Sequence, residues 1–111
     1  MQVNEYQKAA MATLNPALDK KDVLINSVMG LCGESGEAID IMKKWLMQGH
    51  ELDKAHLIKA RGDVAWYLAE AAIALDISLE AVFQGNLDKL RQRFSNGFDV
   101  GASVNCKEDD L

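Results

Sequence analysis

The chain has 111 residues and a formal net charge of −5 at pH 7. This length fits one domain, which can bury a core and still leave surface for a partner subunit to cover. The acidic balance argues against a dedicated nucleic-acid-binding protein, because such proteins usually display a basic patch. No apolar run approaches the roughly 18 residues of a membrane span, and no signal-peptide pattern opens the chain.

The two cysteines, Cys32 and Cys106, suggest neither a disulfide framework nor a C-x-x-C motif. A reducing cytosol is therefore the expected compartment. Together with the charge and the hydropathy, this predicts a soluble cytoplasmic protein with no nucleic-acid partner and no membrane partner.

A single proline and the near absence of strand-like alternation predict an all-α fold. The first helix is expected from about Asn4 to Leu14, where Asn15-Pro16 breaks it. The second helix is expected from Lys21 or Asp22 to about Gln48. Gly49 is its natural stop. The apolar residues that recur at helical spacing, and are expected on its inner face, are Leu24, Val28, Leu31, Ile39, Met42 and Leu46.

The third helix is expected from about Lys54 to Leu75. Asp53 is its expected N-cap, because the side-chain oxygen can accept from the first free backbone N–H groups. Asp76-Ile77-Ser78 forms the next joint, and a fourth helix is expected from there to about Phe94. Four helices with short connections predict a bundle of mostly antiparallel neighbours.

The helical pattern dissolves after Phe94, where glycines and a charged run follow. Residues 1–94 are therefore expected to form a single all-α domain. Residues 95–111 are expected to form a loose tail or an arm that docks on a partner.

Glu34 and Glu37 stand out in the second helix, since two carboxylates one turn apart repel each other. Asp63 is a lone carboxylate in an apolar stretch of the third helix, where burial without a partner is costly. A cation between facing helices would relieve both, and carboxylate oxygens without nearby histidines favour Mg²⁺ or Mn²⁺ over Zn²⁺. Lys44 lies near the same face and can meet a phosphorylated ligand. An ordinary solvated helix face remains the alternative.

An ordered series of phrases spans about Val23 to Phe94. The phrases are Gly30-Leu31-Cys32-Gly33-Glu34-Ser35-Gly36-Glu37, Lys43-Lys44, Gln48-Gly49-His50-Glu51-Leu52, Gly62-Asp63-Val64-Ala65-Trp66-Tyr67-Leu68-Ala69 and Asn86-Leu87-Asp88-Lys89-Leu90. In this order they resemble the MazG-type nucleoside triphosphate pyrophosphohydrolases. The resemblance implies hydrolysis of a nucleoside triphosphate between its α- and β-phosphates. It also implies a four-helix unit that forms a homodimer or a homotetramer and completes its nucleotide pocket with the partner.

In that family an E-x-x-E pair and a later E-x-x-D pair hold Mg²⁺. Glu34 and Glu37 match the first pair, and Asp63 matches the final aspartate, so the resemblance makes these three the metal ligands. Glu34 and Glu37 are also the candidate catalytic residues, with Glu37 placed to assist the attacking water.

Other residues that match the family pattern are the candidates for binding the substrate. The resemblance directs Lys44, Asn86 and Lys89 toward phosphate or the nucleotide. Trp66 and Tyr67 are core aromatics in the simpler interpretation, and the alternative is that one of them stacks beneath a base.

One position departs from the family pattern. The E-x-x-D pair requires a glutamate at position 60, where this chain has Ala60. Asp63 therefore lacks its partner, although Asp40, one turn beyond Glu37, can lend an oxygen. Weak metal binding and low turnover are expected. The alternatives are a catalytically weak or inactive nucleotide-binding relative, and a helical oligomerisation module without a nucleotide site.

Overall fold

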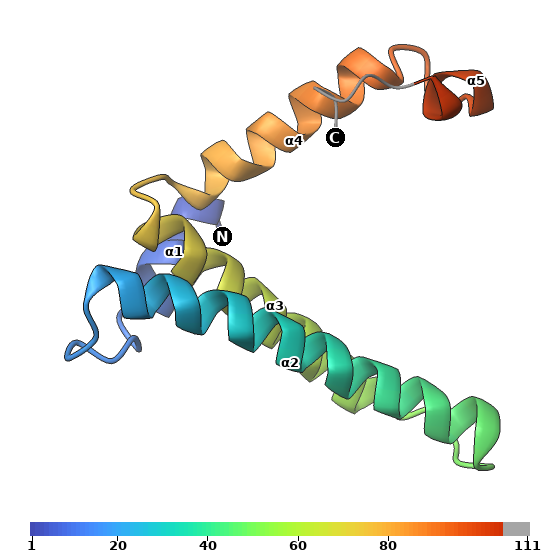
Figure 1. Ribbon diagram of the computed structural model, residues 1–111, viewed down its shortest axis with the longest axis horizontal. Helices are drawn as coiled ribbons and strands as arrows, with labels where there is room; N and C mark the ends of the chain where they lie inside the picture. The colour runs from blue at the N-terminus through green and yellow to red at the C-terminus, as the bar shows by residue number, and fades with distance from the viewer. Residues whose placement is uncertain (106–111) are drawn as a thin grey trace. The chain divides into compact units, whose positions relative to one another are not determined.

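The computed structural model describes residues 1–105, and its regular elements are helices (Figure 1). They are α1 (Val3–Met11), α2 (Lys20–Met47), α3 (Lys54–Ala74), α4 (Leu79–Arg93) and α5 (Val100–Val104). The all-α fold is therefore confirmed, and α2, α3 and α4 begin and end close to the expected residues. Helix α1 ends at Met11, three residues before the expected Leu14, so it stops before Asn15-Pro16. The short α5 was not expected, because it lies in the segment assigned to a loose tail. The end of that segment, residues 106–111 with Cys106, lies outside the described residues.

Local signals set the ends of the two longest helices. At the start of α2, the Asp19 carboxylate accepts the backbone N–H of Asp22 at 2.8 Å. At the start of α3, the Asp53 carboxylate accepts the backbone N–H of His56 at 3.0 Å. Between them, Gly49 has a φ of 72°, a left-handed conformation that ends α2. The expected stop at Gly49 and N-cap at Asp53 are therefore confirmed.

The start of α2 and the end of α3 are linked at Asp76. This residue has a φ of 57° and turns the chain after α3. Its carboxylate pairs with the ammonium group of Lys20 at the start of α2. Gln7 of α1 joins the same corner, because its amide group donates to the Ile77 carbonyl at 3.3 Å and accepts the Leu79 N–H at 2.8 Å. All three helices therefore meet at this joint.

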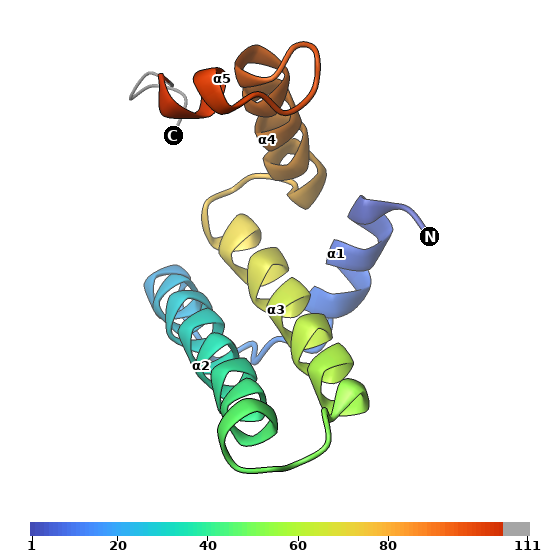
Figure 2. The same ribbon diagram turned by 90° about the vertical axis from the view of Figure 1, so that its right-hand side faces the viewer.

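Helices α2 and α3 lie side by side and antiparallel, as Figures 1 and 2 both show. We call the line along which they meet the seam. Along the seam, residues of α2 lie opposite residues of α3. In order from the joint toward Gly49, the pairs are Asn26 with Glu70, Gly30 with Tyr67, Glu34 with Asp63, and Glu37 with His56. Most of these side chains are polar, so the seam differs from an apolar helix contact.

The two pairs nearest the joint are closely fitted. Glu70 is 0% exposed, and the amide of Asn26 donates to both of its carboxylate oxygens at 3.0 Å. At Gly30, an added Cβ would lie 2.1 Å from a ring carbon of Tyr67. The tyrosine ring therefore occupies the space that any larger residue at position 30 would need.

The face of α2 that meets α3 is only partly the face that was expected, since Leu24 and Leu31 are half-buried. The buried residues of α2 are Val23, Ser27, Ala38 and Ile41. Val28, Ile39 and Leu46, which were expected inside, are 56%, 68% and 60% exposed. The expectation was wrong for these three residues because α2 carries apolar residues on more than one face, and periodicity alone does not say which face a neighbour covers.

The chain forms two compact units, Met1–Leu79 and a second unit that begins at Glu80. The first contains α1, α2 and α3. In the second, the rings of Phe94 and Phe98 lie 5.6 Å apart, and Asp99 caps α5. The expectation of one domain over residues 1–94 stays a prediction.

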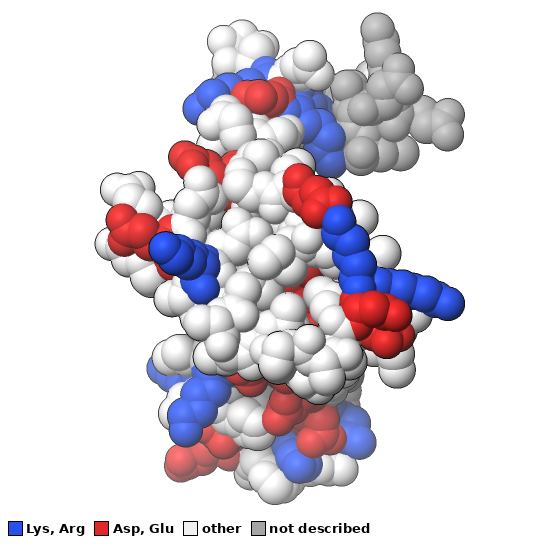
Figure 3. All heavy atoms as spheres, turned by 90° about the vertical axis from the view of Figure 1, so that its left-hand side faces the viewer, with Lys and Arg blue, Asp and Glu red and all other residues white. Residues whose placement is uncertain are grey.

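None of the helices within residues 1–105 is both long enough and apolar enough to cross a membrane. On the face drawn in Figure 3, lysine and arginine side chains lie among aspartate and glutamate side chains. The described part of that face therefore shows mixed charge, and the expected lack of a nucleic-acid partner stays a prediction.

Candidate functional site

A pocket of about 360 Å³ lies along the seam. It is lined by Glu34 from α2 and by Asp63, Trp66 and Tyr67 from α3. The three α3 residues are three and four positions apart, so the helix presents them within one turn of each other. The pocket therefore combines carboxylates from two helices with two aromatic rings, and its volume falls at the small end of ligand pockets.

The electrostatics of this pocket centre on Glu34. Its side chain is half-buried, and its Oε2 atom is buried without a hydrogen-bond partner. Burial raises the pKa of Glu34 above its ordinary value, a hydrogen bond shared with Glu37 raises it further, and the charges of Asp63 and Glu37 act in the same direction. Nearby His56 acts on the pKa of Glu34 in the opposite direction. A divalent cation would relieve such a group of carboxylates.

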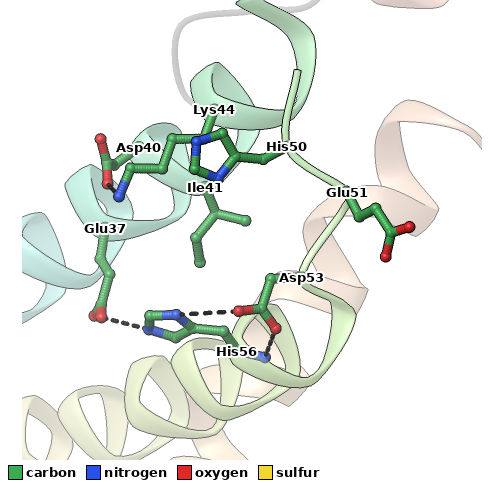
Figure 4. A pocket seen from close by; sticks show the side chains of 8 residues that line it. All are labelled: Glu37, Asp40, Ile41, Lys44, His50, Glu51, Asp53 and His56. Carbon is green, nitrogen blue, oxygen red and sulfur yellow. Dashed lines mark hydrogen bonds and ion pairs between the residues drawn. The ribbon is translucent and has the colours of Figure 1, made fainter. Parts of the chain in front are cut away.

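A second pocket of about 240 Å³ lies beside Glu37, and Figure 4 shows its lining. The residues are Glu37, Asp40, Ile41, Lys44, His50, Glu51, Asp53 and His56. Glu37 and His56 point toward each other, with 2.6 Å between Glu37 Oε1 and His56 Nε2. The other ring nitrogen, Nδ1, faces Asp53 Oδ2 at 3.9 Å. The imidazole therefore stands between two carboxylates.

The assumption that no histidine lies near the acidic residues was wrong. His56 contacts Glu37 across the seam, although the two are far apart in the sequence. A signal was present, because His56 lies four residues before Ala60 and seven before Asp63. Those spacings place it on the same face of α3 as the candidate ligand.

Lys44 has a partner on its own helix. Its Nζ lies 3.0 Å from Asp40 Oδ2, and the hydrogen bond and charge of Lys44 hold the pKa of Asp40 below its ordinary value. Asp40 therefore points at Lys44 rather than toward a cation beside Asp63, to which it was expected to lend an oxygen. A phosphate oxygen would have to replace Asp40 at Lys44, which is feasible because exposed ion pairs are weak.

Trp66 and Tyr67 have a structural role and also line the pocket. The Trp66 indole N–H donates to the Ala10 carbonyl at 3.1 Å and to the Thr13 hydroxyl at 2.9 Å, which holds α1 on α3. The rings of Trp66 and Tyr67 meet edge to face, 5.3 Å apart. Both interpretations of these aromatics remain compatible with the pocket. Stacking beneath a base stays a prediction.

Asn86 and Lys89 lie on α4, beyond the start of the second unit. Their contact with phosphate or nucleotide stays a prediction. Ala60 is 1% exposed and lies on the same side of α3 as Asp63, as its spacing requires.

The candidate metal ligands are brought to one seam. However, among the side chains of residues 1–105, no group of three His, Cys, Asp or Glu is placed closely enough to hold a metal ion as it stands. The donor chemistry nevertheless fits a divalent cation, because Glu37 and Asp63 both act to raise the pKa of Glu34 and one buried oxygen of Glu34 has no partner. Ligation by these residues stays a prediction.

Comparison with known proteins identifies the family. The family model described as the MazG nucleotide pyrophosphohydrolase domain matches residues 24–98. The "Gene 37 protein" of Mycobacterium phage L5 is 36% identical over 113 residues, which cover 95% of this chain and 99% of that protein. No solved structure shows a significant match. The match over most of the chain confirms the resemblance drawn from the ordered phrases, and the chain belongs to the MazG nucleotide pyrophosphohydrolase family.

Proposed function

We propose that this protein is a Mg²⁺-dependent nucleoside triphosphate pyrophosphohydrolase that releases a nucleoside monophosphate and pyrophosphate. Membership of the family supports hydrolysis of a nucleotide. The observation that carries the proposal is the pocket in which Glu34 and Asp63 meet across the seam beside two aromatic rings. Carboxylates suit a hard divalent cation, and aromatic rings offer an apolar surface to a base.

In this proposal Glu34, Glu37 and Asp63 hold Mg²⁺, or Mn²⁺ in its place. The cation, when bound, supplies neutralisation of the triphosphate charge and activation of water. Glu37 orients the attacking water or accepts its proton. Lys44 exchanges Asp40 for a phosphate oxygen, which charge attraction favours because a phosphate carries more negative charge than a carboxylate.

The proposed working unit is a homodimer or a tetramer of two dimers. Its support is the apolar surface that α2 leaves outside the seam, which includes Val28, Met29, Ile39, Leu46 and Met47. Exposed apolar patches often mark interaction surfaces. Ile39→Glu should therefore shift the sedimentation coefficient toward that of a monomer. A wild-type protein that sediments as a monomer at micromolar concentration would contradict this part of the proposal.

A catalytically weak or inactive nucleotide-binding relative is the second candidate. It is favoured by Ala60, because the buried methyl group supplies no oxygen where the family has a glutamate. Both candidates predict that nucleotide and Mg²⁺ stabilise the protein. Only the enzyme predicts release of pyrophosphate.

The test combines two measurements on purified protein with Mg²⁺ and a panel of ribo- and deoxyribonucleoside triphosphates. The first is pyrophosphate release, and the second is thermal denaturation. A ligand present at 100 times its Kd stabilises the folded state by about 2.7 kcal/mol, which is readily detected. Stabilisation without pyrophosphate release supports the inactive relative. If the nucleotides cause neither stabilisation nor pyrophosphate release, both nucleotide-binding proposals are refuted.

Matched variants locate the site. Glu34→Gln keeps the size of the side chain and removes its charge, so release should fall by about 10-fold or more if a metal ligand is weakened. Glu51→Gln makes the same change on a residue that points away from Glu37 and His56 in Figure 4. It should leave release unchanged. Equal activities for the two variants would refute the placement of the site at Glu34.

A further inference from the structure

We propose that His56 supplies the ligand that Ala60 does not. The bound cation would then be held by an imidazole nitrogen together with the carboxylates of Glu34, Glu37 and Asp63. This inference rests on the proposed function, since it concerns the same metal site.

The position of His56 is the first argument. Its Nε2 atom lies 2.6 Å from Glu37 Oε1, so it already contacts one candidate ligand from the opposite helix. It lies one turn before Ala60 on the same face of α3, and two turns before Asp63. Apart from Asp63 itself, His56 is thus the nearest side-chain donor on that face to the site of the missing glutamate.

The surroundings of the ring are the second argument. Asp53 faces Nδ1 through Oδ2 at 3.9 Å, while its Oδ1 accepts the backbone N–H of His56 at 3.0 Å. Histidines that bind metals usually donate a hydrogen bond from the second ring nitrogen to a carboxylate or carbonyl, which fixes the tautomer. At 3.9 Å the Asp53 carboxylate lies near Nδ1 but beyond hydrogen-bond distance, so it would have to move closer to make that bond. Nε2 must also give up any proton that it shares with Glu37 before it can bind a cation. Figure 4 shows this order of groups, with Asp53 on one side of the ring and Glu37 on the other.

The chemical consequence is a change in metal preference. Sites built from carboxylates alone suit Mg²⁺, whereas imidazole suits the later first-row ions. The contribution of His56 should therefore favour Mn²⁺ modestly, and Co²⁺ more strongly, over Mg²⁺. Ala60 would then alter which ion the site accepts rather than remove the site.

Metal binding to the intact protein without nucleotide tests this directly. Calorimetry measures the affinities for Mg²⁺ and Co²⁺, and pulsed electron paramagnetic resonance of bound Mn²⁺ detects a coupled ¹⁴N nucleus. His56→Ala and His56→Asn should abolish the coupling and weaken Co²⁺ binding by about 10-fold or more, with a smaller effect on Mg²⁺. The His56 side chain is 46% exposed, so neither change should unfold the protein.

His50→Ala is the matched control, because His50 lines the same pocket beside Lys44 rather than facing Glu37. It should keep the ¹⁴N coupling and the affinity of the wild type. His56→Glu should move the preference back toward Mg²⁺. Circular dichroism confirms that each variant is folded.

The outcomes separate this inference from the proposed function. If Glu34→Gln weakens Mn²⁺ binding but the wild type shows no ¹⁴N coupling, or a coupling that survives in His56→Ala, the metal site stands and the role of His56 is refuted. If Mn²⁺ does not bind, or binds equally well to Glu34→Gln, the metal site of the proposed function fails and this inference fails with it.

Discussion

Ala60→Glu restores the E-x-x-D pattern of the family and tests the assignment of α3. Ala60 is 1% exposed, so the new side chain must enter the seam near Glu37 and Asp63. Overpacking typically costs about 1–3 kcal/mol. A poorly solvated carboxylate among other carboxylates adds to that cost. Without metal, we therefore expect the variant to lose about 3 kcal/mol of stability, or about 12 °C in Tm for a domain of this size.

A divalent cation should reverse much of this loss. The added carboxylate supplies one more oxygen and one more negative charge, and we expect Mg²⁺ to bind at least ~10-fold more tightly, which corresponds to about 1.4 kcal/mol. At 100 times its Kd the ion stabilises the folded state by about 2.7 kcal/mol. The rate of pyrophosphate release should rise by about 10-fold if the same energy is available in the transition state.

The assay is thermal denaturation with and without Mg²⁺, followed by pyrophosphate release at saturating nucleotide. Arg61→Glu is the control, since Arg61 is exposed and the next residue on a helix points about 100° away. It should respond to Mg²⁺ as the wild type does. If Ala60→Glu folds normally, and its Mg²⁺ response and turnover equal those of the wild type, position 60 is outside the metal site. The alignment of α3 with the family motif would then be wrong. Ala60→Asp, which is shorter, repeats the test if the glutamate prevents folding.

Two further predictions concern the fitted end of the seam and are measured by urea denaturation. Gly30→Ala should destabilise the protein by about 1–2 kcal/mol, because the added methyl would lie 2.1 Å from a carbon of Tyr67. Gly33→Ala, with open space around it, should instead stabilise α2 by about 0.5–1 kcal/mol. Equal effects of the two substitutions would contradict the close contact at Gly30. Asn26→Ala removes the amide that donates to the buried carboxylate of Glu70 and should lower the stability of the protein by about 3 kcal/mol. Adding Glu70→Met in the same chain should restore most of that stability. Purely additive effects of the two substitutions would show that the pair is not coupled.

Helix ends could be predicted from the sequence because their causes are local. Asp53 caps α3 through a backbone group three residues away, and Gly49 ends α2 through its own left-handed conformation. Neither requires knowledge of the rest of the fold. The candidate carboxylates were also found from the sequence, since spacing along a helix and the family pattern both point to them.

The packing faces could not be predicted in the same way. Val28 and Ile39 satisfy the helical period of an inner stripe, yet both are exposed, because the side of α2 that α3 covers is a property of the pair. His56 was missed for a related reason. The spacing along α3 places His56 on the face of Asp63, but its contact with Glu37 exists only once α2 and α3 have turned back on each other, and that contact is not contained in the pattern of either helix alone.

The contact of Gly30 with Tyr67 also sets the register of the helix pair. If α3 slid along α2 by two turns, the tyrosine ring would meet Val23 or Glu37, and neither leaves room for it as Gly30 does. The contact therefore disfavours such a slide and supports the alignment that brings Glu34 opposite Asp63, several residues away from the carboxylates themselves. Two like charges would not choose that alignment on their own, because they repel. The close fit at one end of the seam thus holds together, at its middle, a group of charges that would otherwise separate.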